Sequence, residues 1–302
     1  MTAISPPREQ VRPAPATRTR KGPRRIRRFT GGVIVSYVLV ILYALTLVIP
    51  LYWLFISGFK DRLATIGNPF APTFSAGVSH FKEVWGLLDM GQAMLNSLYI
   101  TAAALVLTLV AAVPAAYGVA RAGGRTAVYV ERLYALGFLI PGFAALLPTL
   151  LIAIHINMYN LREFMILLMP ATAQPLAVIL LAQFMRTVPA ELEESATMDG
   201  AGRFRILWSI YLPLTMAGIA TVSILNFISF WNEYLFTFII TGTSPAVRTV
   251  QVALPTLQGN RGVTDYALVT AATTIAVLPV FAVYAVLNRR MENALVQGAL
   301  KG

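Results

Sequence analysis

The sequence predicts an all-α membrane protein with six transmembrane helices and a helix-turn-helix between spans 4 and 5. Three observations support this fold class. The chain of 302 residues is 57% hydrophobic and only 12% charged, whereas soluble domains carry about 25% charged residues. Six apolar runs are each long enough to cross a bilayer, which takes about 20 residues. A polar stretch from Glu191 to Leu214 separates two of these runs.

The N-terminal tail, residues 1–29, is rich in proline and arginine and precedes the first apolar run. A segment of this composition cannot bury enough apolar surface to fold alone. We predict a disordered cytosolic tail that contacts anionic membrane lipid. A nucleic-acid-binding arm is the alternative interpretation. Because the net charge of +11 is concentrated beside a membrane span, we expect no nucleic-acid partner.

The first apolar run, Val33 to Ser57, has no charged residue. It is too long for the core of a signal peptide, so we expect it to remain as a membrane anchor. The third run contains Pro141 and Pro148, which predict a kinked or broken helix. This third run lies within Leu133–Ile154, and the second lies within Gln92–Ala120. The fourth, fifth and sixth are Phe164–Met185, about Leu214–Ile240 and Tyr266–Asn288. Together they define a transmembrane domain, residues 30–290, followed by a cytosolic tail, residues 291–302.

The distribution of Lys and Arg predicts the orientation of the spans. Eighteen of these residues lie on the side of the N-terminus and six on the other side. Cytosolic segments carry the excess of positive charge, so both termini are predicted to be cytosolic. The polar stretch, which we call the elbow (residues 187–213), is then cytosolic too. The longest loop on the opposite side, residues 58–90, either meets an extracellular partner or is a spacer.

The elbow has the features of two short helices joined by a glycine turn. Thr187 can cap the first helix, and Pro189 can occupy its first turn. Gly200 and Gly202 interrupt the helical pattern, because glycine accepts backbone angles that side chains forbid. A second short helix can then run from Arg203 to Tyr211. The positive N-terminal end of the first helix suits three acids: Glu191, Glu193 and Glu194.

Several kinds of chemistry are missing from the sequence. The chain has no cysteine, and its two histidines, His80 and His155, are far apart, so we predict no metal site. No lysine lies in the G-x-x-x-x-G-K-[ST] loop that binds nucleotide phosphates. No paired carboxylates or activated nucleophile suggest an enzyme. No ionisable residue lies at the centre of a span, where ion-coupled carriers place them. We therefore expect no catalytic residue and no cofactor, and a partner polypeptide that supplies energy through the elbow.

One motif in the elbow carries a family resemblance. Glu194-Ser195-Ala196, Gly200, Ile210 and Leu212-Pro213 match the pattern E-A-A-x3-G-x9-I-x-L-P. The chain therefore resembles the permease subunits of binding-protein-dependent ABC importers. Ser195 replaces the usual alanine, and both residues are small. Trp231-Asn232-Glu233-Tyr234 is similar to the W-N-[ED]-[FY] segment of carbohydrate importers. Pro50, Trp53 and Asn96-Ser97-Leu98 also resemble that group, in particular its maltose-type G subunit.

The resemblance implies a sugar importer in the bacterial plasma membrane. Its implied partners are a second homologous permease, a cytosolic ABC ATPase dimer that uses the ATP, an extracytoplasmic solute-binding protein, membrane lipid and the sugar substrate. The implied ATPase-coupling residues are Glu191, Glu194, Ser195, Ala196, Asp199, Gly200 and Ala201. The residues implied to line the substrate path are Asn226, Trp231, Asn232 and Glu233.

Other interpretations remain open at this point. The same importer role can serve another polar solute, such as glycerol phosphate or an amino sugar. A carrier driven by an ion gradient and a membrane assembly factor are the other two classes. For single residues, Glu233 can be an interfacial helix-end charge and Glu194 a solvated one. Core packing is the expectation for three residues of the elbow: Phe204, Leu207 and Trp208.

Overall fold

The computed structural model describes residues 31–122, 124–259 and 264–299, so the predicted N-terminal tail lies outside the described residues. The described residues form helices, turns and loops, with no β-strand among them. The chain divides into two compact units, Met1–Ile49 and Pro50–Gly302. Helix α1 (Gly31–Ser57) belongs to both units, and everything else described below lies in the second unit.

Within the described residues, four helices are long and apolar enough to cross a membrane, and the number of candidate spans rises to six if each of two bent pairs is one span. The long helices are α1, α4 (Met90–Arg121), α7 (Arg162–Arg186) and α15 (Tyr266–Ala299). The bent pairs join Gly124–Leu139 to Gly142–His155 at 84° and Arg203–Leu214 to Met216–Trp231 at 77°. The all-helical membrane fold predicted from the sequence is therefore confirmed.

Shorter elements connect these helices. They are α2 (Arg62–Gly67), α3 (Ser79–Leu87), α5 (Gly124–Leu136), η1 (Gly137–Leu139), η2 (Gly142–Ala145), α6 (Leu146–His155), α8 (Ala190–Met198), α9 (Arg203–Ile206), η3 (Leu207–Tyr211, a π-type turn), α10 (Leu212–Leu214), α11 (Met216–Trp231), α12 (Leu235–Thr241), α13 (Val250–Ala253) and α14 (Thr256–Gly259). Helix α15 continues through the first part of the predicted C-terminal tail, and residues 300–302 lie outside the described residues.

The third span is broken where the sequence predicted a kinked or broken helix. The break falls at Pro141, which has extended backbone angles between η1 and η2. Pro148 lies instead in the first turn of α6, where its missing N–H removes no helical hydrogen bond. Pro141 thus follows the end of one helix, and Pro148 lies in the first turn of the next. A proline disturbs helical hydrogen bonding least at these two places.

The fifth span differs from the single run expected over Leu214–Ile240. Helix α11 ends at Trp231, and a new helix, α12, begins at Leu235. Glu233 lies in the break, where its Oε1 accepts a hydrogen bond from the backbone N–H of Phe236 at 2.8 Å. The carboxylate thus satisfies an N–H group that the start of α12 leaves without a helical partner. The expected continuous run was wrong, because apolar composition does not reveal a break whose polar groups are satisfied locally.

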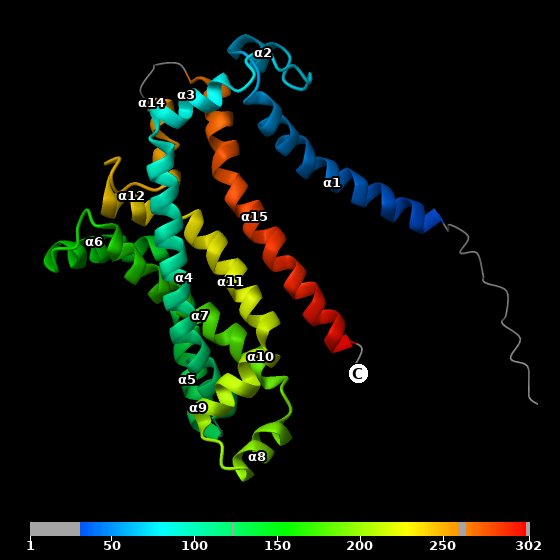
Figure 1. Cartoon of the computed structure of the whole chain (residues 1–302), viewed down its shortest axis with the longest axis vertical. Helices are drawn as coiled ribbons and strands as arrows, with labels where there is room; N and C mark the ends of the chain where they lie inside the picture. The colour runs from blue at the N-terminus through cyan, green and yellow to red at the C-terminus, as the bar shows by residue number, and fades with distance from the viewer. Residues whose placement is uncertain (1–30, 123, 260–263, 300–302) are drawn as a thin grey trace, which may run out of the picture. The chain divides into compact units, whose positions relative to one another are not determined.

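The centre of the second unit is the contact between α4 and α7, which run side by side (Figure 1). Small buried residues line the contact: Ala104, Ala112, Ala116, Ala173 and Ala177. Small side chains let helix backbones approach closely in a membrane. Helix α11 packs against α7 at Gly218, where an added Cβ would lie 2.5 Å from Cγ of Phe184. These three helices therefore form a tightly packed block.

The end of α4 that is remote from the elbow is fastened by Asn96, which is fully buried. Its amide nitrogen donates to the carbonyls of Ala246 and Arg248, both at 3.0 Å. Its amide oxygen accepts hydrogen bonds from Arg162 at 2.6 Å and Gln92 at 3.1 Å. One side chain thus joins α4, the start of α7 and the loop between α12 and α13.

Candidate functional site

The elbow begins with α8, whose first turn carries Glu191 and Glu193 as the sequence predicted. Acidic side chains there are stabilised by the positive end of the helix. The helix starts one residue after Pro189. The prediction that Thr187 caps α8 was wrong: its hydroxyl donates to the carbonyl of Phe184 at 2.7 Å. Thr187 thus bonds back to the end of α7, because the extended Pro189 directs the chain away from it.

Gly200 closes α8 with a Schellman motif. Its φ is +81°, a left-handed conformation that favours glycine. The N–H of Gly200 donates to the carbonyl of Thr197 at 3.0 Å, and the N–H of Ala201 donates to that of Ala196 at 2.9 Å. This pair of hydrogen bonds defines the motif, and Ala196 and Ala201 both pack against the same apolar core cluster. The motif explains why a glycine stands at position 200 and small residues stand at Ala196 and Ala201.

The second half of the elbow turns the chain back toward the membrane helices. Gly202 begins α9 with ordinary extended angles, φ −72° and ψ 159°. The π-type turn η3 follows, and it buries Leu207 and Tyr211. Such widened turns are frequent at functional sites. Here the turn brings the Tyr211 side chain, which is fully buried, beneath α8.

Glu193 joins both halves of the elbow to α4. Its two carboxylate oxygens accept hydrogen bonds from the hydroxyls of Tyr117 at 2.8 Å and Tyr211 at 2.7 Å. The carboxylate also forms an ion pair with Nε of Arg121 at 3.1 Å. Hydrogen bonds to a charged acceptor are about twice as strong as neutral ones. We call these four residues the Glu193 cluster.

Arg121 strengthens this cluster through two further contacts. Its guanidinium donates to the carbonyl of Val188 at 2.6 Å and lies 4.8 Å from the ring centre of Tyr211. The rings of Tyr117 and Tyr211 meet edge to face with their centres 4.9 Å apart. The end of α4, the start of α8 and η3 are therefore connected through one partly buried cluster, so that α8 is fixed to a membrane helix.

The outward face of α8 has the opposite character. Glu191, Glu194, Ser195 and Asp199 are all exposed. The carboxylate of Glu194 makes no hydrogen bond or ion pair with the part of the chain that the structure describes. Two neighbouring acids thus have different surroundings: Glu193 binds inside this chain, and Glu194 is open to a partner.

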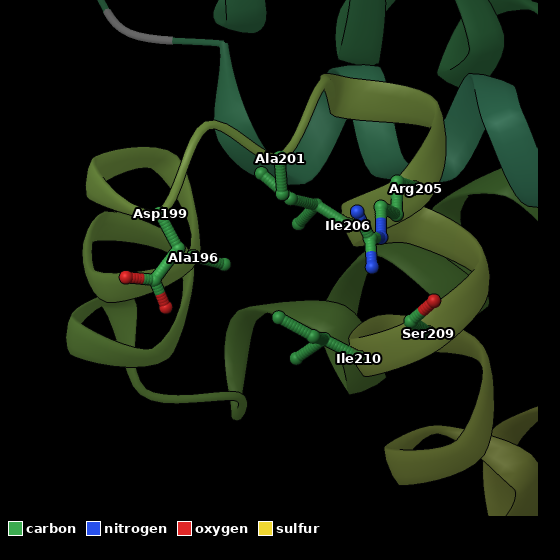
Figure 2. A pocket seen from close by; sticks show the side chains of 7 residues that line it. All are labelled: Ala196, Asp199, Ala201, Arg205, Ile206, Ser209 and Ile210. Carbon is green, nitrogen blue, oxygen red and sulfur yellow. The ribbon is translucent and has the colours of Figure 1, made fainter.

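A small hollow lies between α8 and the second half of the elbow (Figure 2). Its volume is about 230 Å³, which is room for one large side chain. Ile206 and Ile210 form its apolar wall, and Asp199 and Arg205 stand on opposite sides of it. Three of the predicted coupling residues line it: Ala196, Asp199 and Ala201.

Two aromatic residues of the elbow are not where the sequence analysis expected them. Leu207 is buried, as expected, but Phe204 is 74% exposed and Trp208 is 52% exposed. Their ring centres lie 5.8 Å apart. One face of the π-type turn carries Leu207 and Tyr211 into the core, so Phe204 and Trp208 point away from it. The prediction of core packing was therefore wrong for these two residues.

The residues predicted to line a substrate path lie at two depths in the fold. Asn226 and Trp231 are buried in α11, and Nε1 of Trp231 donates to the carbonyl of Ala276 in α15 at 3.1 Å. Asn232 is exposed at the break after α11, where its oxygen accepts a hydrogen bond from Gln251 at 3.1 Å. Glu233 lies beside it at the start of α12.

Sequence reasoning placed Glu193 only at the positive end of a helix and did not identify which residues fasten the elbow or which residue faces Asn232. These are Tyr117, Arg121, Glu193, Tyr211 and Gln251. The one available signal was the spacing of Tyr117 and Arg121, four residues apart at the polar end of an apolar run, which places them on one helical face. Their partner Glu193 is 76 residues away from Tyr117, so no local pattern identifies it.

The apolar helices of spanning length, with a polar elbow between two of them, are features of a membrane protein. Residues 104–293 match the family described as "Binding-protein-dependent transport system inner membrane component". The chain belongs to this family. It is 30% identical over 284 residues to the diacetylchitobiose uptake system permease protein NgcG of Streptomyces coelicolor, covering 91% of this chain and 90% of that protein.

Two more proteins extend the comparison. The melibiose/raffinose/stachyose import permease protein MelC of Bacillus subtilis is 30% identical over 232 residues, which cover 76% of this chain and 83% of MelC. A chain from the crystal structure of a bacterial ABC transporter that imports the polysaccharide alginate has a TM-score of 0.74 at 23% identity, covering 85% of this chain and 95% of that one. This last likeness concerns the fold.

Proposed function

We propose that this chain is the permease subunit of an ATP-driven sugar importer and forms half of its translocation pathway. Its relatives include permeases named for the uptake of diacetylchitobiose and of melibiose, raffinose and stachyose. The chain itself performs no catalysis, holds no cofactor and takes its energy from ATP hydrolysed by an ATPase on the cytosolic side. Both termini and the elbow face the cytosol in this proposal, as the excess of Lys and Arg on that side supports.

The observation that carries the proposal is the attachment of α8 to α4 through the Glu193 cluster. A helix that is fixed at its base and closed by the Gly200 motif can transmit a displacement, whereas a flexible loop would absorb it. An ATPase that moves α8 therefore moves α4 and, through the small-residue contact, α7. The exposed acids Glu191, Glu194 and Asp199 and the exposed Ser195 offer the ATPase a polar surface.

The hollow beside α8 offers the ATPase a docking site of defined size. Its volume of about 230 Å³ and its apolar wall fit one apolar side chain of the ATPase. Asp199 and Arg205 at its sides can pair with polar groups around that side chain. The complex is completed by a second homologous permease, by a solute-binding protein that delivers the sugar outside, and by the surrounding lipid.

On the substrate side, we propose that Asn232, Glu233 and the newly found Gln251 contact the sugar. Sugar hydroxyl groups both donate and accept hydrogen bonds, and amide side chains match them by offering both functions. Buried Asn226 has an amide nitrogen without a hydrogen-bond partner in the described chain, and it adds a donor deeper in α11. Trp231, which packs against α15, supports these residues from behind. Another polar solute, such as an amino sugar or glycerol phosphate, would use the same groups.

Reconstituted vesicles test the proposal. The chain is purified in complex with its second permease and ATPase subunits, and the complex is supplied with ATP inside the vesicles and with binding protein and labelled oligosaccharides outside. We expect uptake that needs ATP and binding protein and that persists when ionophores dissipate ion gradients. Gly200→Asp is expected to assemble but to lose the stimulation of ATP hydrolysis by loaded binding protein. Uptake that ionophores abolish, without any need for the ATPase, would identify an ion-driven carrier instead.

A further inference from the structure

The loop that follows α1 buries a lysine and exposes large apolar side chains. We call residues 59–76 the α2 loop. Lys60 is fully buried, and its ammonium donates to the carbonyls of Asn68 at 3.0 Å and Pro69 at 2.8 Å. Burial lowers the pKa of Lys60, so these carbonyls have to offset the cost of removing a charge from water.

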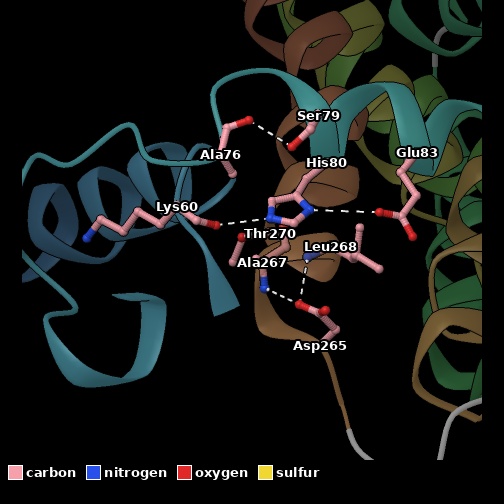
Figure 3. Close-up of polar contacts among 9 residues, drawn as sticks. All are labelled: Lys60, Ala76, Ser79, His80, Glu83, Asp265, Ala267, Leu268 and Thr270. Atoms are coloured by element: carbon pink, nitrogen blue, oxygen red, sulfur yellow. Dashed lines mark hydrogen bonds and ion pairs between the residues drawn. The ribbon is translucent and has the colours of Figure 1, made fainter. Parts of the chain in front are cut away.

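Further hydrogen bonds close the α2 loop into a fixed structure. The N–H of Asp61 donates to the Ser75 hydroxyl at 2.9 Å, and the N–H of Ala76 donates to the carbonyl of Phe59 at 3.0 Å. The carbonyl of Lys60 lies 3.1 Å from Nε2 of His80, which fastens the loop to α3 (Figure 3). The exterior of the loop is therefore a defined surface.

That exterior is apolar. Leu63 is 84% exposed, Ile66 63%, Phe70 55% and Phe74 63%. Asp61 and Arg62, at the start of the loop, are its only charged residues outside the buried Lys60. Leu63 and Ile66 are three residues apart and share one face of α2. A soluble loop that exposed this many large apolar groups together would be an interaction site.

One hydrogen bond shows how far along α1 this surface lies. The hydroxyl of Tyr52 donates to the carbonyl of Phe70 at 3.1 Å. Tyr52 precedes the last residue of α1, Ser57, by five positions, which is about 7 Å along the helix axis at about 1.5 Å per residue. Helical side chains lean toward the N-terminus, which moves the contact still further from the end of α1. The α2 loop therefore folds back beside the last turns of an apolar span.

We propose that the α2 loop is an interfacial membrane anchor, with Leu63, Ile66, Phe70 and Phe74 inserted into the headgroup–acyl boundary of the bilayer. The loop meets the end of α1 at the hydrogen bond between Tyr52 and Phe70, and Leu51 and Tyr52 there are each 40% exposed. Lipid at the depth of Tyr52 is thus the occupant that the geometry favours. Apolar side chains on a short polar-backed element bind this boundary through their buried area. The inference does not depend on which solute the permease transports.

Single-cysteine labelling tests this proposal, because the chain has no native cysteine. The variants Leu63→Cys and Ile66→Cys each receive a nitroxide label, and the assembled permease is placed in phosphatidylcholine vesicles. Lys82→Cys on α3 is the water-exposed control and Val110→Cys on α4, which is 66% exposed, the bilayer control. Collision of each label with oxygen, which enters the bilayer, is compared with collision with a nickel chelate, which stays in water.

We expect the ratio of oxygen to nickel collisions at Leu63 and Ile66 to exceed the ratio at Lys82 several-fold. A ratio equal to that of Lys82 would place the loop in water, and suppression of both collisions would place a protein partner over it; either result overturns the proposal. A second variant checks the mechanism. Replacing Lys60 by Met in the labelled Ile66→Cys chain is expected to sharpen the nitroxide spectrum, because the loop loses its internal ammonium. An unchanged spectrum would contradict the role of Lys60 in shaping the surface.

Discussion

The Glu193 carboxylate and the Tyr211 hydroxyl lie 2.7 Å apart across the elbow. Glu193 is on the outer helix α8, and Tyr211 is fully buried in the turn that leads to α11. Because Tyr117 and Arg121 of α4 meet the same carboxylate, one acid connects α8 to α4 and to the turn that leads to α11. The neighbouring acid, Glu194, takes no part in this cluster.

This difference gives a matched pair of variants. Glu193→Gln is expected to lower the free energy of unfolding by about 1.5 to 3 kcal/mol, the range for hydrogen bonds to charged groups, and to uncouple ATP hydrolysis from transport. Glu194→Gln is expected to leave stability unchanged and to weaken only the association with the ATPase. Thermal unfolding of the purified chain and ATPase assays of the complex measure both effects. Equal stability losses in the two variants would contradict the assignment.

Two glycines of the elbow form a second pair. An added Cβ meets no atom within 4 Å at either Gly200 or Gly202, so the variants differ only in backbone conformation. Gly200→Ala is expected to cost about 1 to 2 kcal/mol of unfolding free energy, because alanine is strained at φ +81°. Gly202→Ala, at φ −72°, is expected to be neutral or stabilising by about 0.4 to 1 kcal/mol. Chemical denaturation in detergent provides the comparison.

Gly218 tests the packing of α11 on α7. Gly218→Ala forces a methyl group against Phe184, and overpacking of this kind costs about 1 to 3 kcal/mol. Gly118→Ala in α4 adds a methyl group with no neighbour within 4 Å and is expected to stabilise the helix by about 0.5 to 1 kcal/mol. Opposite shifts in the melting temperature are the expected result. Similar shifts would mean that α11 can move away from α7 without cost.

Asn96 is expected to hold the loop between α12 and α13. Asn96→Leu leaves the carbonyls of Ala246 and Arg248 without their donor, at about 1 to 3 kcal/mol. Amide hydrogen exchange should then rise selectively in residues 242–250. Gln92→Leu removes only one of the partners of Asn96 and should leave exchange in that loop nearly unchanged. Unaltered exchange in Asn96→Leu would refute its fastening role.

For the proposed sugar contact, Asn232→Ala is expected to raise the substrate concentration that gives half-maximal uptake. The loss of one neutral hydrogen bond, about 1 kcal/mol, corresponds to a change of about fivefold. Because Asn232 is exposed and its hydrogen bonds to Gln251 and to the carbonyl of Ile228 lie at the surface, the melting temperature should fall only slightly. A large fall in melting temperature with unchanged half-saturation would assign Asn232 a structural role instead.

The parts of this fold that local chemistry determines were predictable. Long apolar runs, the proline break at Pro141 and the glycine that ends α8 each depend on residues close together in sequence. The Glu193 cluster was not predictable, because it depends on a side chain that meets partners from distant helices. The interruption of the fifth span also escaped prediction, since Glu233 satisfies the freed N–H of Phe236 locally and is a single charge near the end of an otherwise uncharged run.

The bend of 77° between Arg203–Leu214 and Met216–Trp231 has a mechanical consequence. Two rigid helices joined nearly at right angles convert a displacement along the axis of the first into a lateral displacement of the second. Displacement along the axis of Arg203–Leu214 would therefore tilt α11 sideways. A small movement at the membrane surface would then widen or narrow a passage between helices, without sliding a helix through the bilayer.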